Sequence, residues 1–362
     1  MKNILVGYVL DGKHSGIDKY LLGVCRVAHE EKVRLDFLTE EITPWIKEYL
    51  EDLGFGLYEV PSLKNPIGQY KAIKKIIKDN NYDGVYANIS ESFNCMLLLA
   101  AKTSGIPCRM VHSHSSGVDR ASRLTRTLRT ALHKLFVPVV NRISARRYAC
   151  SDVAGKWMFG RKDYKIIYNA VDKSRFAFNL ASRLNTRNEL GLRDEHVLIH
   201  VGNFCYTKNQ RFLMEIMQKI TEKDENAVLL SVGTGYDADA VCEYARSLGI
   251  NDKVRFLGVR DDVPALLCAA DAYVFPSRFE GLSISCIEAQ MSGLPCILSD
   301  TLSRDTQITP SVKFLPLNSA EEWADAVINS FGERKSAELF KDAVHNYDIA
   351  YQKKQLSEIL KG

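Results

Sequence analysis

Two glutamates stand eight positions apart in the segment FPSRFEGLSISCIEAQMSG, residues 275–293. Glu280 precedes a predicted helix and Glu288 lies inside it, so an acid flanks the helix N-terminus on each side. Free backbone N–H groups and the positive end of the helix dipole make this N-terminus a binding place for phosphate, with the hydroxyl of Ser283 beside it. A carboxylate would repel the phosphate, so we expect each acid to bind neutral hydroxyl groups. A nucleotide-sugar, with its ribose, diphosphate and hexose, has this layout.

The same residues also fit an interpretation without a ligand. Ser285 and Glu288 match a capping box, in which the acid only binds the first N–H of the helix. Glu280 alone could be an ordinary surface acid of a loop.

A second segment, HVGNFCYTKNQRFLMEI at residues 200–216, favours the ligand site. It follows a predicted strand and leads into a helix expected to begin near Asn209. Gly202 permits a close backbone approach. Lys208 stands at the helix N-terminus, where the dipole disfavours a cation unless an anion is present. We therefore predict that Lys208 contacts the same diphosphate.

These segments, together with SVGTGYD at residues 231–237, resemble the retaining family-4 glycosyltransferases of GT-B architecture. The likeness is to the branch that assembles exopolysaccharide and capsule repeat units. It is strong over residues 105–330 and is limited to pattern in the first hundred. It implies hexosyl transfer with retention from a nucleotide-sugar, with a UDP-sugar favoured, to a lipid-linked or polysaccharide acceptor, with no cofactor and no metal.

The resemblance also implies residue roles. Lys208 would contact the donor diphosphate, Glu280 the donor sugar and Glu288 the ribose. The other implied donor contacts are the phosphate and sugar site at Gly202, Gly281, Leu282 and Ser283, and the nucleobase turn at Val259 and Arg260.

One position departs from the family pattern. The residue after Gly202 is usually basic, and here it is Asn203. The departure leaves three outcomes open: a weaker site, a substitute arginine from elsewhere in the chain, or loss of activity.

The N-terminal half supplies further candidates. PCRMVHSHSSG, residues 107–117, ends a predicted strand with His112 and His114, whose side chains share one face of that strand. The family places a histidine here, near donor sugar and acceptor, and we favour His114. The alternative is a pair of hydrogen-bonded structural histidines; a metal pair is disfavoured because no third ligand lies nearby. Gly16 resembles the family's first glycine-bearing loop.

Residues 109–147 carry nine Lys and Arg against one acid, Asp119, a net charge of +8 in a chain of net charge +4. A helical wheel places leucines on one side of this segment and arginines over another. The hypothesis is that the arginines bind an anionic membrane surface; the alternative is a helix with inward leucines and solvated arginines. Nucleic acid is disfavoured because aromatic residues do not alternate with the arginines and no known reader motif accompanies them. The predicted membrane residues are Arg120, Arg123, Arg126 and Arg129.

Apolar strands alternate with amphipathic helices along the whole chain, which predicts an α/β fold with two Rossmann-like, doubly wound parallel sheets. We expect an acceptor-side domain at residues 1–165 and a nucleotide-sugar domain at 166–339, with a helix at about 340–362 that packs back on the first. In doubly wound sheets, ligands bind beyond the carboxyl ends of the strands.

Composition points to a soluble protein, because 46% of the residues are hydrophobic and 25% are charged. No apolar run of transmembrane length and no secretory signal is seen, so the expected location is the cytoplasm, peripherally on the inner face of the plasma membrane. Nine scattered cysteines without a CxxC pair indicate reduced thiols.

Three other functions stay open. An epimerase on the same scaffold would share the donor site, and a non-catalytic nucleotide-sugar-binding protein would fit Asn203. A nicotinamide oxidoreductase rests only on Gly233-x-Gly235, which lacks the third glycine. Asp237 and Asp239 could suggest a metal-binding pair but fit the first turn of a helix better.

Overall fold

The computed structural model describes residues 2–7, 16–119, 122–160, 162–335 and 344–362. The chain forms two α/β units. The first comprises Met1–Val118, Leu124–Ala170 and Ile349–Gly362, and the second comprises Asp119–Arg123 and Val171–Asp348. The segment predicted at about 340–362 thus contributes its last 14 residues to the first unit.

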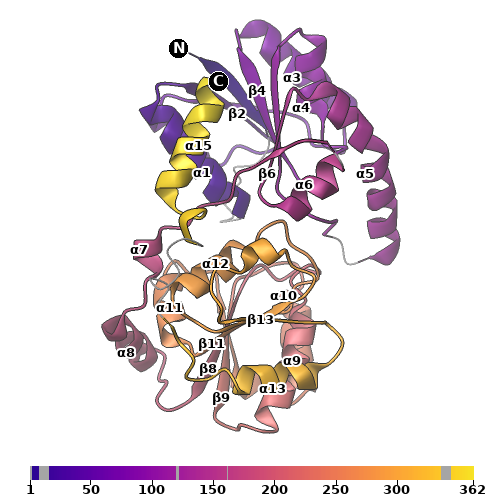
Figure 1. The fold of residues 1–362 in the computed structure, drawn as a ribbon. Coiled ribbons are helices and arrows are strands. Elements are labelled where there is room, and N and C mark those ends of the chain that lie inside the picture. Colours follow the sequence, from indigo (N-terminus) through magenta and orange to yellow (C-terminus); the bar gives the residue numbers. More distant parts are fainter. Residues whose placement is uncertain (1, 8–15, 120–121, 161, 336–343) are drawn as a thin grey trace. The chain divides into compact units, whose positions relative to one another are not determined.

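The first unit contains a seven-stranded sheet in which all pairings are parallel, in the order β3-β2-β1-β4-β5-β6-β7. Its strands β2, β4 and β6 are labelled in Figure 1. The order reverses between β1 and β4, and ligands of doubly wound sheets bind at the carboxyl ends next to such a reversal. The strands are β1 (Asn3–Gly7), β2 (Arg34–Thr39), β3 (Gly56–Glu59), β4 (Gly84–Ile89), β5 (Cys108–Ser113), β6 (Arg146–Ala149) and β7 (Lys165–Ile166).

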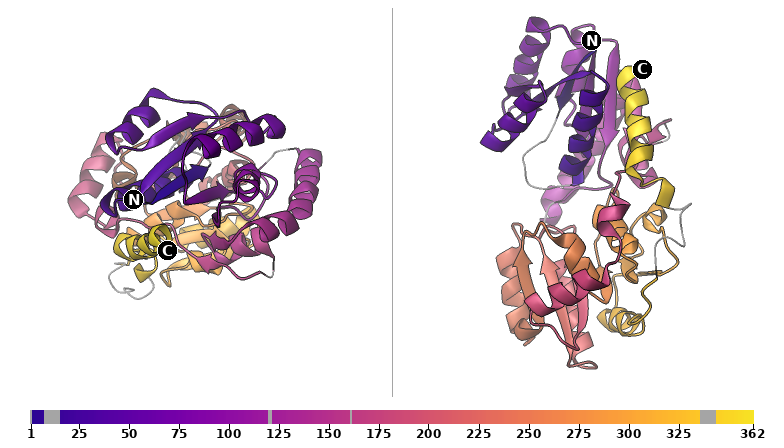
Figure 2. Two further views of the ribbon diagram at one scale, coloured as in Figure 1. Left: turned by 90° about the horizontal axis from the view of Figure 1, so that it is seen from above. Right: turned by 90° about the vertical axis from the view of Figure 1, so that its left-hand side faces the viewer.

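Helices pack on this sheet, and the last helix of the chain is one of them. α15 lies beside α1 in both views of Figure 2, and its Leu356, Ile359 and Leu360 join the core over β1 and β2. Gln352 of α15 donates to the carbonyl oxygen of Tyr168 at 2.7 Å. The helices are α1 (Gly16–Glu30), α2 (Pro44–Asp52), α3 (Pro66–Asp79), α4 (Met96–Thr103), α5 (Arg123–Ile143), α6 (Asp152–Phe159) and α15 (Ile349–Lys361).

The second unit repeats this plan with six parallel strands in the order β10-β9-β8-β11-β12-β13. Its reversal lies between β8 and β11. The strands are β8 (His196–Val201), β9 (Ala227–Val232), β10 (Val254–Gly258), β11 (Ala272–Phe275), β12 (Cys296–Ser299) and β13 (Val312–Leu315).

One face of the second sheet packs against α9, α10 and α13, where Leu213, Met217 and Trp323 are fully buried. The helices of the unit are α7 (Lys173–Phe176), α8 (Leu180–Glu189), α9 (Gln210–Thr221), α10 (Ala238–Ser247), α11 (Val263–Ala269), α12 (Ile284–Met291) and α13 (Ala320–Ile328), with short 3-10 turns at Asn251–Lys253 and Arg304–Thr306.

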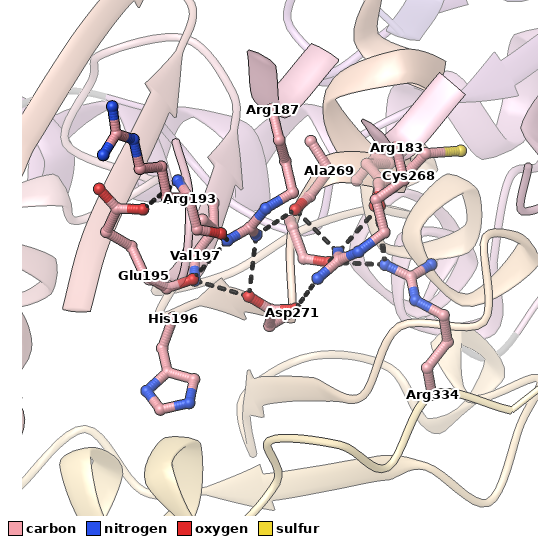
Figure 3. A network of polar contacts seen from close by, with 12 residues as sticks. Arg183, Arg187, Arg193, Glu195, His196, Val197, Cys268, Ala269, Asp271 and Arg334 are labelled. Atoms are coloured by element: carbon pink, nitrogen blue, oxygen red, sulfur yellow. Dashed lines mark hydrogen bonds and ion pairs between the residues drawn. The ribbon is translucent and has the colours of Figure 1, made fainter. Parts of the chain in front are cut away.

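A cluster of arginines fixes the beginning of β11 (Figure 3). Arg183 donates to the carbonyl oxygens of residues 268–270, which end helix α11 and have no partner inside it, and to Asp271 at 2.6 Å. Arg187 donates to Asp271 Oδ2 at 3.4 Å, and the backbone N–H of Val197 donates to the same oxygen at 2.8 Å. Arg334 donates to the carbonyl oxygen of Ala270 at 2.6 Å, and burial lowers the pKa of this guanidinium to about 10. The network joins the amino-terminal ends of β8 and β11.

The predicted fold class is confirmed: both units are doubly wound parallel sheets. No helix in the described part of the chain combines the length and the apolarity needed to cross a bilayer.

Candidate functional site

The two segments predicted to share a ligand lie together in the second unit. β8 and β11 pair in parallel, Ala272 opposite Leu198, so the loops after them meet at one edge of the sheet. The backbone N–H of Arg278 donates to the carbonyl oxygen of Thr207 at 2.7 Å, and Ser277 Oγ donates to the same oxygen at 2.8 Å. The loops 202–208 and 276–280 are therefore hydrogen-bonded to each other at the place where the strand order of the second sheet reverses.

Lys208 and Glu280 form an ion pair across these loops. Lys208 Nζ lies 2.6 Å from Glu280 Oε1, which also accepts a hydrogen bond from Ser277 Oγ at 2.8 Å. Burial opposes the charge of Lys208, but Glu280 more than offsets this effect, and the pKa of Lys208 is raised. Lys208 is therefore a cation at neutral pH. An ammonium has three N–H donors, of which the carboxylate takes one.

Glycines allow the backbone to close behind Lys208. A Cβ on Gly202 would lie 3.4 Å from Lys208 Cδ and Cε. Gly233 has φ +129°, and a Cβ there would lie 2.2 Å from the carbonyl oxygen of Gly202. A Cβ on Gly235 would meet the backbone of Phe204 at the same distance. Gly233-x-Gly235 is thus a close-packing motif under the Lys208 loop, which removes the only feature that favoured a nicotinamide enzyme.

The capping-box interpretation of Glu288 is wrong. Helix α12 begins at Ile284 with Ser283 at its N-cap and without a side-chain capping hydrogen bond. Ser285 Oγ donates instead to the carbonyl oxygen of Val201 at 3.0 Å and accepts from Tyr273 Oη at 2.8 Å. These bonds hold the N-terminus of α12 against the end of β8. Glu288 is buried in α12.

The structure places an arginine that the sequence analysis did not identify next to these loops. Asn203 is exposed, and its carbonyl oxygen accepts from Gln210 at 2.9 Å. Arg278 Nη2 donates to Asn209 Oδ1 at 2.6 Å, and its guanidinium lies 4.7 Å from the centre of the Tyr206 ring. Arg278 stands two residues before Glu280, and this adjacency was its only signal in the sequence.

The remaining predicted donor contacts occupy the same unit. Leu282 and Ser283 are buried at the start of α12, and Gly281 lies between them and Glu280. Val259 is exposed directly after β10, where Gly258 adopts φ +66°. Arg260 pairs with Asp262 at 2.6 Å.

A second group of polar residues lies at the carboxyl ends of β4 and β5 in the first unit. His114 Nε2 donates to Asn88 Oδ1 at 3.0 Å, because the amide nitrogen of Asn88 faces the carbonyl oxygens of Gly7 and Tyr86. Tyr86 Oη lies 2.8 Å from His112 Nδ1. His112 Nε2 and His114 Nδ1 are buried without a partner among the described residues.

Burial controls the charge of both imidazoles. It lowers the pKa of His114 to about 3, and it lowers the pKa of His112 well below the ordinary value, with a further contribution from His114. Both rings are neutral near pH 7. With Nε2 of His114 donating to Asn88, its Nδ1 is an acceptor for a hydroxyl group. Gly16 begins α1 in the same unit.

Part of the basic segment forms helix α5 (Arg123–Ile143), and the leucines of this helix do not face inward as the alternative interpretation expected. Its buried residues are His133, Val140 and Ile143, whereas Leu124, Leu128, Leu132 and Leu135 are exposed. The interpretation with inward leucines is therefore wrong. Arg129 forms an ion pair with Glu91. Arg123 and Arg126 lie on the same helix, and Arg120 lies outside the described residues.

Metal ligands do not cluster in the described parts of the chain, where no group of three or more His, Cys, Asp or Glu could hold an ion. Asp237 occupies the N-cap of α10 and Asp239 its first turn. The two acids thus belong to the beginning of a helix.

Comparison with known proteins agrees with this geometry. Residues 182–346 match the family model of glycosyl transferases group 1. The matched residues cover most of the second unit, which is thus similar to this family. The chain is 28% identical over 307 residues to the glycosyltransferase EpsF of Bacillus subtilis, which covers 82% of this chain and 79% of that protein.

Two further similarities bear on the site. The chain is 26% identical over 298 residues to an Escherichia coli UDP-Gal:alpha-D-GlcNAc-diphosphoundecaprenol alpha-1,3-galactosyltransferase, covering 79% of this chain and 76% of that enzyme. The crystal structure of Anabaena Alr3699/HepE in complex with UDP and glucose superposes with a TM-score of 0.78 at 17% identity and covers both chains completely. This likeness shows a shared fold.

Proposed function

We propose that the protein is a retaining glycosyltransferase that transfers a hexose from a UDP-sugar to a lipid-linked or polysaccharide acceptor in exopolysaccharide or capsule synthesis. The observation that carries the proposal is the Lys208–Glu280 pair, which lies where the strand order of the second sheet reverses. The E. coli relative, whose name states a UDP-galactose donor and a diphosphoundecaprenol acceptor, supports the substrate classes.

The chemistry follows from the charges around this pair. Cleavage of the bond between sugar and phosphate leaves negative charge on the departing diphosphate. Lys208 and the free N–H groups at the start of α12 stabilise that charge, which is electrostatic catalysis by fixed groups. Glu280 binds hydroxyl groups of the donor sugar and Glu288 those of the ribose. The acceptor attacks from the face that the diphosphate leaves, and a donor phosphate oxygen takes its proton.

The other candidate residues have supporting roles in this scheme. Val259 and Arg260 border the nucleobase. Neutral His114 accepts a hydrogen bond from a substrate hydroxyl through Nδ1, and His112 supports its ring. The rings of the two histidines lie 4.2 Å apart. The enzyme acts at the inner face of the plasma membrane, where the basic residues of α5 meet anionic lipid.

A donor and acceptor panel tests the proposal. The protein is incubated with UDP- and GDP-sugars, with and without undecaprenyl-diphosphate-linked saccharide, and the products are separated by chromatography. Transfer of a hexose to the lipid, with the anomeric configuration of the donor retained, is the expected result. Epimerised donor without acceptor would identify an epimerase. Donor binding without turnover on any acceptor would identify a binding protein, and either result would overturn the proposal.

A further inference from the structure

Helix α5 carries a continuous apolar stripe that points away from its own unit. Taking Leu124 as 0° at about 100° per residue, the stripe occupies roughly 0–80°, whereas the buried residues His133, Val140 and Ile143 occupy about 100–180°. The leucines at 124, 128 and 135 expose 70%, 61% and 69% of their surface. The stripe consists of Leu124, Leu128, Leu132, Leu135 and Val139.

The neighbouring side of α5 is anchored by several contacts, so the exposure of the stripe is a property of the folded unit. His133 accepts from the backbone N–H of Ser92 at 3.0 Å, donates to the carbonyl oxygen of Trp157 at 3.0 Å and stacks on the indole at 3.8 Å. Arg129 pairs with Glu91 and covers the ring of Phe93. These contacts fix the rotation of the helix about its axis.

Cations border the stripe and acids are absent from the helix sequence. Arg123 and Lys134 fall at about 260–280° on the same wheel, about 80° or more from the edge of the stripe. Arg142 follows Val139 by one turn. A hollow of about 520 Å³ lies at the C-terminal end of α5. It is lined by Val137, Pro138, Asn141, Arg142, Phe159 and Lys162. Two of these six side chains are cations.

We propose that the leucine stripe of α5 inserts into the interface of an anionic lipid bilayer, with the bordering cations on the headgroups. Helices with an apolar face bordered by Lys and Arg lie in the plane of such an interface. Charge selects this occupant over a second copy of the chain, because two α5 helices would bring like charges together. Arg142 and Lys162 bind a lipid phosphate at the hollow. The proposal extends the membrane association proposed above, since it makes apolar insertion the main contact.

Vesicle binding tests the insertion. The whole protein is sedimented with vesicles of phosphatidylglycerol and phosphatidylcholine, and the partition coefficient is compared with that of Leu124→Gln/Leu128→Gln/Leu135→Gln. Loss of three exposed leucines that would be buried in lipid should lower the coefficient by about 100-fold or more. The matched control is Leu180→Gln/Leu184→Gln on α8, where the two leucines are 61% and 60% exposed, and it should partition like the wild type.

Two further measurements separate insertion into lipid from self-association of the helix. A Leu128→Trp variant should be quenched by lipids with brominated acyl chains, and quenching no greater than that of the wild type would overturn insertion. Sedimentation equilibrium without lipid should give the same mass for wild type and triple variant. A larger mass for the wild type alone would assign the stripe to a second copy and overturn the proposal. UDP binding is measured in parallel, so that failure of this proposal is distinguishable from failure of the proposed function.

Discussion

Lys208 Nζ and Glu280 Oε1 lie 2.6 Å apart, and they come from the loops that follow the two strands at which the second sheet reverses its order. A diphosphate bound at this place would share the ammonium with the carboxylate. The pair therefore holds the cation in position before the ligand arrives, and Ser277 holds the carboxylate. Pre-positioned charges of this kind stabilise developing negative charge without reorganisation during the reaction.

Replacing Lys208 by Met should lower kcat by about 100-fold or more, because one fixed electrostatic contact to the leaving group is lost. Lys208→Arg should retain part of the activity. The comparison variant is Lys219→Met, whose lysine pairs with Glu222 on the surface of α9. Product formation from a saturating UDP-sugar measures the effect. Equal rates for the 208 and 219 variants would contradict the assignment.

Glu288→Gln should weaken UDP binding by about 10-fold to 100-fold, because hydrogen bonds to a charged group contribute about 1.5–3 kcal/mol. Because Glu288 is buried in α12, thermal melting of the variant is measured first. Calorimetric titration with UDP gives the affinity. Glu215→Gln serves as the control, because Glu215 accepts a hydrogen bond from Tyr244 on the surface of the same unit. Unchanged affinity in the 288 variant would remove the ribose contact.

Arg278 is expected to replace the cation that Asn203 does not supply. Arg278→Ala should raise the Kd for UDP by about 10-fold, as expected for loss of one charge-assisted contact. Adding Asn203→Arg to this variant should restore most of the affinity. Arg211→Ala is the matched control, because Arg211 also lies over a tyrosine ring, that of Tyr244. Failure of the second substitution to restore binding would leave the substitute-cation interpretation without support.

The neutral state of His114 predicts a pH dependence that a single substitution should change. Its pKa of about 3 keeps Nδ1 unprotonated above about pH 4, so the wild-type rate should show no titration of this group between pH 5.5 and 8. In Asn88→Asp a carboxylate would face Nε2 and raise the pKa of His114. Activity should then fall as the pH drops below that raised pKa and recover as the pH rises above it.

The control for this prediction is Asn88→Ala, which removes the acceptor without adding a charge. It should lower the rate equally at all pH values in that range. Because Asn88 is buried, thermal melting and UDP binding of both variants are measured first. A folded Asn88→Asp protein with the wild-type pH profile would show that Asn88 does not set the protonation of His114.

Asp271→Asn should destabilise the second unit by about 2–3 kcal/mol, somewhat less than removal of one partner from a fully buried pair. The substitution leaves Arg183 and Arg187 without their carboxylate and weakens the contact to Val197. Urea unfolding followed by circular dichroism measures the change. Asp262→Asn removes the exposed partner of Arg260 and should cost less than about 1 kcal/mol. Equal midpoints for the two variants would contradict a structural role of the network.

The sequence contained enough information for the sheets and for the meeting of the two loops. Buried parallel strands are continuous apolar runs, and β8 and β11 show this pattern clearly. The edge strands β3, β7 and β13 are two to four residues long and partly exposed, so no long apolar run in the sequence marks them. Their existence depends on a neighbour with which to pair.

The contacts within the site were beyond prediction from the sequence for a different reason. The tether from Ser285 to Val201 and the approach of Arg278 to Asn209 depend on loop conformation and on side-chain rotamers. The outward direction of the α5 leucines depended on tertiary contacts as well. Periodicity identifies a stripe, but the rotation of the helix is set by His133 and its partners Ser92 and Trp157.

Helix α15 has a consequence for how the polypeptide is made. The core of the first unit includes Leu356, Ile359 and Leu360, packed with residues such as Leu21 of α1. A ribosome therefore exposes most of that unit long before it delivers the helix that closes it, whereas residues 171–348 are already complete. The half that is translated first is the last to mature. Removing residues 349–362 would therefore disrupt the core of the unit that is translated first.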